Sequence, residues 1–425
     1  HVPIRASLVK SAAALFSIGS GGSIGREGPM VQLAAMLASF IGRWRQFTPP
    51  QLRLIVACGA AAGIASAYNA PIAGSFFVAE IILGTIAMES LGPLVVSAVT
   101  ATLTLHVLTA AHVLYRVPAF GEVSPLEMLT YALLGIVTGV LAPVFLATLK
   151  NAERFFVALR LPVVLRLALG GLAVGAIAIN VPQVCGNGYP VIVELLKGNY
   201  LAVTIVGLVA CKWLATMASF GSGAPGGIFT PALFMGAGSG LLLGNAVHQV
   251  WPAAATSPIA FALVGMGAFL AAASHAPLMA VILLFEMTMS YDIILPLLLS
   301  SVVAYYTARG ISGASLYSEA LRRKTEAAAP APAETLVADL MRPDSRVVEP
   351  TARFADLAKL FLRHRVNNLY VTDIGGRFLG AVSLSDIKPY LHEPDLAGLV
   401  LARDIVREDF PRLAPEQTYW LERER

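Results

Sequence analysis

Apolar residues along this chain occur in long blocks, and polar residues gather between the blocks and toward the C-terminal end. Several blocks are shorter than the roughly 20 residues that a helix needs to cross a bilayer core. Glycine and proline interrupt them, which is typical of discontinuous membrane helices whose broken backbone is buried in protein or lines a polar cavity. Ordinary spans kinked by glycine and proline are the alternative. The predicted segments are 6–24, 30–42, 52–66, 71–88, 92–111, 128–149, 161–180, 200–219, 229–247, 257–273, 277–289 and 293–309.

The two halves of this apolar region resemble each other. Gly19–Pro29 aligns with Gly221–Pro231 at an offset of 202, and Asn69–Glu80 aligns with His275–Glu286 at an offset of 206. The first pair is a glycine-rich break, and the second begins with an Ala-Pro step and ends on one acidic residue. Corresponding breaks in two halves indicate the binding site of a transporter. The alignment leaves open whether the repeats are parallel or inverted.

Composition and charge point to the same class of protein. The 425 residues are 56% hydrophobic and 13% charged, whereas an ordinary soluble domain is about 45–50% apolar and about 25% charged. Of the charged residues, 23 lie before residue 311 and 33 lie after residue 310, and Trp213–Phe285 has none. Disordered chains are excluded by this apolar content, and disulfide scaffolds by the 3 cysteines, which show no paired spacing. The chain is therefore predicted to be a polytopic membrane protein with a polar tail.

The tail differs in composition from the rest of the chain. A basic cluster, Arg322–Lys324, predicts that the tail lies in the cytoplasm. A helix over Phe354–Arg365 and strands over Leu369–Asp373 and Phe378–Ser383 predict an α/β module. Because the chain opens on a histidine, we expect it to start inside a longer protein. The expected domains are a transmembrane domain over 1–318, a Pro/Ala linker over 319–334 and the tail module over 335–425.

Gly25-Arg-Glu-Gly-Pro29 is the strongest candidate for chemistry. A glycine-rich loop that opens a helix presents unpaired N–H groups and the positive end of the helix dipole to an anion. Gly227, Ile228 and Phe229 form a matching helix start in the second repeat. Two such starts facing each other suit a halide, since backbone dipoles replace its water but still release it. The alternative is that the glycines serve only close helix packing.

Glu27 is an ionisable residue inside an apolar repeat, which is a functional-site hypothesis by default. The alternative is that it only stabilises a helix N-terminus. In a site built for anions, however, a carboxylate competes with the substrate. Glu27 is therefore predicted to block the site when charged and to open it by protonation or displacement.

These residues resemble a known family. Gly25–Pro29, Gly227–Pro231, Asn69–Pro71 and Ser315–Tyr317 look like the CLC family of chloride channels and chloride/proton exchangers, in the right order over nearly the whole membrane part. The resemblance implies an all-α inverted-repeat membrane fold with discontinuous helices, a homodimer with one anion pathway per subunit, and a bacterial inner-membrane location.

Site residues follow from the same resemblance. It implies that Glu27 is the gating glutamate and that the inner side of the anion site is formed by the Tyr317 hydroxyl, which as an alternative is an interfacial aromatic. It implies no required cofactor, no metal and no enzymatic activity, with chloride and lipid as partners and no nucleic acid. The implied anion-binding set is Gly25, Arg26, Gly28, Gly227, Ile228, Phe229 and Tyr317.

Two departures from the family pattern leave the transport mode open. Exchangers usually carry an inner proton-transfer acid at the position of Ile81, and the neighbouring Glu80 lies about 100° round a helix. The family's Gly-Ser-Gly-x-Pro motif, expected upstream of Glu27, is absent because the chain begins too late. Channel or exchanger, and chloride or fluoride, are therefore alternatives that remain open.

The tail resembles a CBS domain through Val337–Met341, Asn368–Val371 and Gly380–Asp386. The resemblance implies that Ser383 and Asp386 contact an adenosine nucleotide, and the alternative is that they only cap the next helix. Residues 402–406 resemble the start of a second CBS motif that the chain does not complete.

Two other classes of protein fit less well. A membrane metalloprotease needs a His-Glu-x-x-His helix, which the sequence lacks. A cation channel needs acidic rings along its pore. The charge-free run over Trp213–Phe285 argues against such rings.

Overall fold

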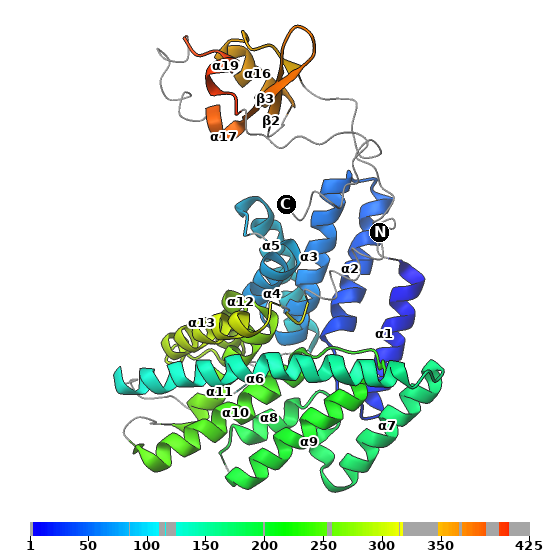
Figure 1. Cartoon of the computed structure of the whole chain (residues 1–425). Coiled ribbons are helices and arrows are strands. Elements are labelled where there is room, and N and C mark those ends of the chain that lie inside the picture. Colours follow the sequence, from blue (N-terminus) through cyan, green and yellow to red (C-terminus); the bar gives the residue numbers. More distant parts are fainter. Residues whose placement is uncertain are drawn as a thin grey trace. The chain divides into compact units, whose positions relative to one another are not determined.

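The structure is a computed structural model of the whole chain, and it divides into two units, 1–322 and 323–425, which are described separately (Figure 1). The first unit is helical, and the second contains a small sheet. The described residues are 3–84, 86–109, 115, 125–198, 200–252, 257–313, 315–317, 347–364, 368–387 and 399–407.

The helices of the first unit follow the predicted apolar segments, with one short addition, α8 (Tyr189–Leu195). Within the described residues, six of them are long and apolar enough to cross a membrane: α3, α5, α6, α7, α9 and α13. Others are shorter apolar helices, so the prediction of discontinuous helices is confirmed. The remaining bounds are α1 Ile4–Gly19, α2 Glu27–Trp44, α3 Pro49–Tyr68, α4 Pro71–Phe77, the π-helical segment η1 Val78–Leu83, α5 Met88–Thr109, α6 Pro125–Ala158, α7 Val163–Asn180, the 3-10 turn η2 Pro182–Val184, α9 Ala202–Gly221, α10 Phe229–Val250, α11 Pro258–Ser274, α12 Pro277–Thr288 and α13 Ile294–Ile311.

Helices α1–α5 and α9–α13 form the two repeats. Equivalent helices are displaced by the same number of residues as the sequence motifs. For example, α1 ends at Gly19 and α9 ends at Gly221, an offset of 202. Asn69 and His275, which follow α3 and α11, both adopt the left-handed conformation, with φ of 52° and 59°. The repeat inferred from the sequence is therefore present in the backbone.

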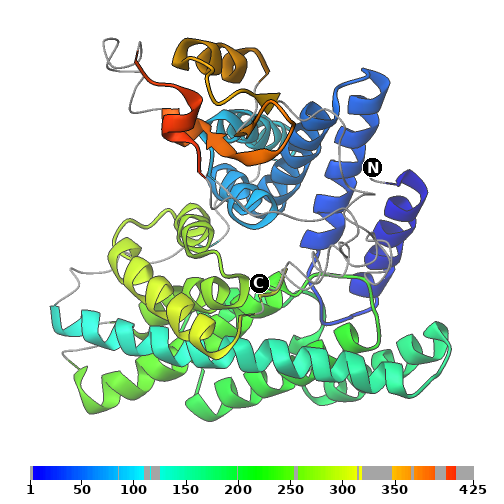
Figure 2. The same cartoon turned by 45° about the horizontal axis from the view of Figure 1, so that its top comes forward.

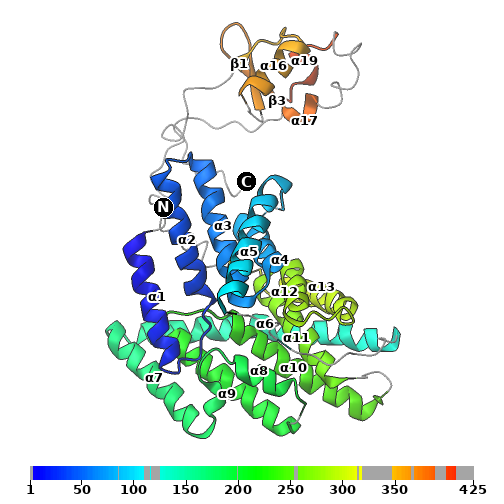
Figure 3. The ribbon, with the colours of Figure 1, turned by 180° about the vertical axis from the view of Figure 1, so that it is seen from behind.

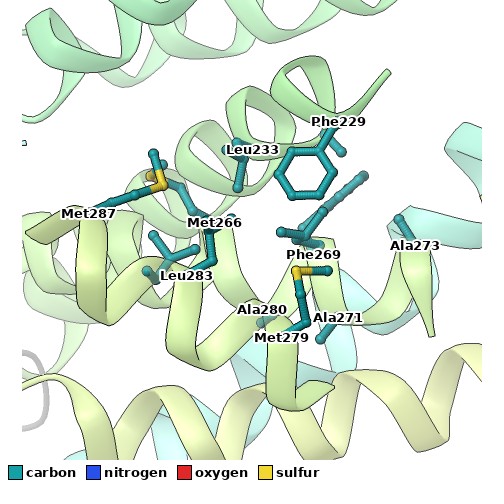
Figure 4. Close-up of a cluster of buried hydrophobic side chains, with 14 of the residues drawn as sticks. Phe229, Leu233, Met266, Phe269, Ala271, Ala273, Met279, Ala280, Leu283 and Met287 are labelled. Carbon is teal, nitrogen blue, oxygen red and sulfur yellow. The ribbon is translucent and has the colours of Figure 1, made fainter. Parts of the chain in front are cut away.

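The core of the first unit lies around α10 and α11, which pack closely on each other. Gly236 of α10 and Gly265 of α11 face each other so closely that a Cβ on either would collide with the other's carbonyl oxygen. Small residues at such contacts let membrane helices approach, which is how packing stabilises them in lipid. Figure 4 shows side chains of α10, α11 and α12 gathered in this core, with Phe229 and Leu233 above Phe269 and Met266.

Nearly all of α11 is buried although it is only 17 residues long, so its short backbone is shielded from lipid. The long helix α6 contacts α9, α11 and α13, and Figure 2 shows it running along this second repeat. Figure 3, from behind, shows α1 beside α2 in the first repeat.

The described part of the second unit contains a three-stranded sheet in the order β1-β2-β3. β1 pairs in parallel with β2, and β2 pairs antiparallel with β3. Its core is formed by apolar residues of the strands and of α16, including Leu357, Leu369 and Val382. The predicted tail strands and helix are present, while Arg365, the predicted helix end, lies outside the described residues, as do Val337–Met341 and Arg322–Lys324. The bounds are β1 Val347–Val348, α16 Phe354–His364, β2 Asn368–Thr372, β3 Phe378–Ser383, α17 Leu384–Ile387 and α19 Ala402–Ile405.

Candidate functional site

The two glycine-rich loops meet directly in front of α2 and α10. The Gly25 amide donates to the Gly227 carbonyl at 2.6 Å, and the Gly227 amide donates back to the Gly25 carbonyl at 2.7 Å. Since these residues are equivalent in the two repeats, an approximate two-fold axis passes between them. Each loop turns at an equivalent glycine, Gly21 with φ of 99° and Gly223 with φ of 93°, a conformation that favours glycine.

Glu27, the first residue of α2, is 3% exposed and lies at the start of both helices. Its Oε1 accepts hydrogen bonds from the Tyr68 hydroxyl at 2.6 Å and from the Thr230 hydroxyl. Its Oε2 has no hydrogen-bond partner in the described part of the chain, and it lies against Gly25 and Gly227. None of the ion pairs found between described residues involves this carboxylate. The positive ends of two helix dipoles therefore face a carboxylate that forms no ion pair with a described residue.

A row of aromatic rings leads away from the carboxylate. The centroids of Tyr68 and Phe229 are 5.1 Å apart, those of Phe229 and Phe77 6.3 Å, and those of Phe77 and Tyr317 5.4 Å. The segment of Tyr317 is tied to the end of α11, because the Leu316 amide donates to the Ala273 carbonyl at 2.8 Å. The row thus links the Glu27 region to the half-buried Tyr317.

The structure brings most predicted anion-site residues together. Gly25, Gly227 and Glu27 are in contact, and Ile228 and Phe229 form the buried start of α10 beside them. Among the described residues, the aromatic row connects Tyr317 to them.

Arg26 and Gly28 lie differently. Arg26 is exposed, and its Nη2 donates to the Ala67 carbonyl near the end of α3, at 3.2 Å. Gly28 is also exposed, and a Cβ there would meet nothing within 4 Å. The Arg26 guanidinium is therefore used to compensate the end of a helix, where carbonyl groups lack partners.

Tyr68 and Thr230 contact Glu27 but were not among the predicted residues. Thr230 stands inside the motif Gly227–Pro231, and Tyr68 directly precedes Asn69–Pro71, so proximity to the motifs is the signal that could have found them. Their hydroxyl oxygens are 3.1 Å apart.

Helix α9 supports the loop before Glu27. The Ser23 amide donates to the Ser219 hydroxyl at 2.9 Å, and the Ser23 and Thr216 hydroxyls are 3.1 Å apart. Lys212 is fully buried one turn earlier, and its Nζ donates to the carbonyls of Val184 and Gly186 at 2.9 and 2.8 Å. This charge directly precedes the charge-free run, and backbone carbonyls satisfy it.

Two further carboxylates cap helices across the repeats. Glu80 in η1 accepts from the Met279 amide at the start of α12, at 2.9 Å. Glu286 in α12 accepts from the amides of Ile72 and Ala73 at the start of α4, at 3.0 and 2.7 Å. Ile81 packs against the core. The Glu80 carboxylate is thus engaged in a cap, directly next to Ile81.

In the tail, Ser383 and Asp386 form a cap of α17. Asp386 accepts from the Ser383 amide at 2.9 Å and hydroxyl at 2.7 Å, and it pairs with Arg407 at 2.5 Å. Burial raises the pKa of Asp386, but the hydrogen bonds from Ser383 and the charge of Arg407 outweigh it and lower the pKa below its usual range. The capping alternative describes this geometry, and nucleotide binding stays a prediction.

The described residues contain no cluster of three or more His, Cys, Asp or Glu side chains that could hold a metal ion. A polytopic helical fold with two facing helix starts and a buried carboxylate between them defines a class: membrane transporters of small anions. The chain belongs to the voltage gated chloride channel family, whose model matches residues 1–309, and a CBS domain model matches residues 337–393. It is thus a multi-pass membrane protein of the CLC type.

Relatives and solved structures agree with this assignment. A putative chloride channel protein ClcB-like from Ralstonia nicotianae is 51% identical over 326 residues, which are 76% of each chain. The voltage-gated ClC-type chloride channel ClcB of Citrobacter koseri is 43% identical over 74% of this chain and 75% of its own length. The crystal structure of a slow cyanobacterial Cl−/H+ antiporter matches with a TM-score of 0.70 at 28% identity and covers 76% of each chain.

Proposed function

We propose that the protein carries chloride across a bacterial membrane through a site at the starts of α2 and α10, with Glu27 as its gate. The observation that carries the proposal is the buried Glu27 carboxylate, which lies at the start of both helices and forms no ion pair with a described residue. A negative group in that position occupies the place that suits an anion. Chloride therefore binds when this carboxylate leaves.

The groups around the site favour an anion that gives up its water at a low cost in free energy. The first amides of a helix lack intrahelical partners, so those of Ile228 and Phe229 are free to replace the water of a halide. Gly25 and Gly227 leave room beside Oε2, since a side chain on either would collide with it. We infer that the same space receives the anion.

The test is chloride efflux from liposomes that contain the protein, with Glu27→Gln as the variant. Glutamine keeps the size of the Glu27 side chain but removes its charge. We therefore expect the rate of efflux to change and to depend no longer on the protonation of residue 27. Glu194→Gln, at an exposed position of α8, is the control and should leave efflux unchanged. Absence of chloride efflux from the wild-type protein under any gradient would contradict the proposal.

A proton-coupled antiporter is the second candidate. It is supported by the 28% identity to a Cl−/H+ antiporter, while Ile81 in place of a proton-transfer acid supports a channel. Chloride-driven proton movement in the same liposomes separates them. Uphill proton movement that Glu27→Gln abolishes identifies an antiporter, and chloride flux without it identifies a channel. Replacing chloride by fluoride in this assay tests the fluoride alternative.

We propose that two copies of the chain associate through the face made by α4, α5, α12 and α13. These helices form a continuous row, because α4 contacts α5 and α12, and α12 contacts α13. Apolar side chains such as Val107 of α5 and Leu295 of α13 are exposed on them. Single-molecule photobleaching in liposomes should give two steps per particle, and single-step bleaching would contradict a dimer.

The tail is proposed to lie on the cytoplasmic side, as the basic cluster Arg322–Lys324 predicts. A protease added to right-side-out and inverted vesicles tests this, since cleavage of the tail should occur only in the inverted ones.

A further inference from the structure

Two hydroxyl groups converge on one oxygen of the gate. Tyr68 is the last residue of α3, and Thr230 lies in the first turn of α10. Both donate to Oε1 of Glu27, and both are almost fully buried, at 3% and 1% exposure. They come from different repeats and reach the same atom, while Oε2 accepts no hydrogen bond from the described residues.

Both donors are held in place by packing. The Tyr68 ring lies against the Phe229 ring, and Phe229 is itself buried in the core of α10 and α11. Thr230 is fixed by its place in the first turn of α10 and by its β-branched side chain, which restricts χ1. Neither hydroxyl has to be ordered when the carboxylate arrives, so little entropy is lost in forming the two bonds.

Both hydroxyl protons are used in the hydrogen bonds to Oε1. Each hydroxyl carries one proton, so when both donate to Oε1 neither has a proton left for the contact between Tyr68 and Thr230. A deprotonated carboxylate can accept both hydrogen bonds, and hydrogen bonds to a charged acceptor are roughly twice as strong as neutral ones. In a site closed to water, this stabilisation is not matched by solvent.

We propose that the Tyr68 and Thr230 hydroxyls are a two-donor latch, which holds the Glu27 carboxylate in the anion site and determines how easily chloride displaces it. The latch rests on the proposed role of Glu27 as the gate and adds the groups that regulate it. It acts in competition with the transported anion. Weakening the latch therefore frees the site for chloride.

The test is chloride efflux at a fixed pH and low chloride concentration for Tyr68→Phe and Thr230→Val, each made alone. Both variants keep the shape of the side chain and remove only the hydroxyl. Since one hydrogen bond to a charged group changes an equilibrium by roughly 10- to 100-fold, we expect efflux to rise by up to about tenfold before another step limits it. If one variant fails to fold, the other still gives the answer.

Matched controls exist on α6. Tyr131 is a buried tyrosine that donates to Glu127 at 3.3 Å outside the site, and Thr138 is a buried threonine that donates to the Leu134 carbonyl of its own helix. Tyr131→Phe and Thr138→Val should leave efflux unchanged. A rise in these controls would mean that loosened packing, and not the latch, controls the rate.

The decisive measurement repeats both variants in the Glu27→Gln background. If the hydroxyls act through Glu27, they change efflux there by less than about twofold, because the charged partner is gone. An equal change in both backgrounds would overturn the latch and assign the hydroxyls to the anion itself, and an unchanged rate in the wild-type background would also overturn it. Failure of the gate proposal looks different: Glu27→Gln alone would then behave as wild type.

Discussion

Gly227 shows at the scale of one residue why the site needs glycine. An ideal Cβ at this position would lie 2.5 Å from Oε2 of Glu27, while its next neighbours are at 3.5 and 3.6 Å, an ordinary contact. A methyl group there would therefore disturb the carboxylate and little else. Because Gly25 and Gly227 have no side chains, the two loops can also approach closely enough to form their reciprocal backbone hydrogen bonds.

Gly227→Ala is expected to lower chloride efflux by about tenfold, an effect of about 1.4 kcal/mol, even in the Glu27→Gln background. The methyl group occupies the space from which the anion would otherwise displace the carboxylate. Efflux from liposomes is the measurement, with Gly171→Ala on α7, which has open space, as the control. Unchanged efflux from Gly227→Ala/Glu27→Gln would show that the anion passes elsewhere.

The sequence indicated some of these residues and not others for a physical reason. Glu27 stands out because a charge in an apolar repeat is costly. Tyr68 and Thr230 are polar but uncharged, and such residues are common in membrane helices. Only the folded chain brings them to Glu27, across 41 and 203 positions of sequence.

At the scale of elements, α4 and α12 are joined by exchanged caps. Glu286 of α12 caps α4, and Glu80, next to α4, caps α12. A carboxylate at a helix N-terminus satisfies unpaired amides and complements the dipole. The sequence alignment paired these two acids but did not reveal that each serves the opposite repeat, because the partner amides are about 200 residues away.

Glu286→Ala is expected to speed hydrogen exchange of the Ile72 and Ala73 amides about 5- to 30-fold, as the loss of roughly 1–2 kcal/mol of capping implies. Glu80→Ala should act instead on Met279. Hydrogen-exchange mass spectrometry in nanodiscs measures both. Glu194→Ala on α8 is the control, and equal effects of the two acids at both helix starts would contradict independent caps.

At the scale of the whole molecule, the two units differ in the forces that hold them. The membrane unit buries apolar side chains and places few charges, while the tail uses ion pairs such as Asp386–Arg407. Arg407 is held beside β3 by reciprocal backbone bonds to Ala381, at 2.9 and 3.2 Å. The stability of the tail therefore depends on pH through the Asp386 carboxylate.

Because the pKa of Asp386 is lowered in the folded chain, we expect acid to destabilise the tail. Its pKa is lower in the folded than in the unfolded chain, so it stabilises the tail above the unfolded value of about 3.9, and the contribution is lost as pH falls through the lower folded value. Hydrogen exchange of β2 and β3 amides in the full chain, expressed relative to the intrinsic rate at each pH, should rise in acid for the wild type. Asp386→Asn should raise it at neutral pH and flatten the acid response, and parallel pH curves for both proteins would contradict this role.

Most of the fold was accessible from the sequence, because apolar block length and glycine breaks determine where membrane helices run. The short α8 was missed, since seven residues give too little periodicity to recognise. The orientation of Arg26 toward Ala67 was also not predictable, because it depends on where α3 ends in space.

The hydrogen-bonded pair Gly25–Gly227 also affects the order in which the site forms during synthesis. During synthesis Gly25 enters the membrane about 200 residues before its partner, which at ~5–20 residues per second is roughly 10–40 s. Throughout that interval its amide and carbonyl lack the partner that the finished protein provides, and the Glu27 carboxylate lacks Thr230. The anion site is therefore completed only once α10 has been made, and a nascent chain arrested before α10 holds only half of it.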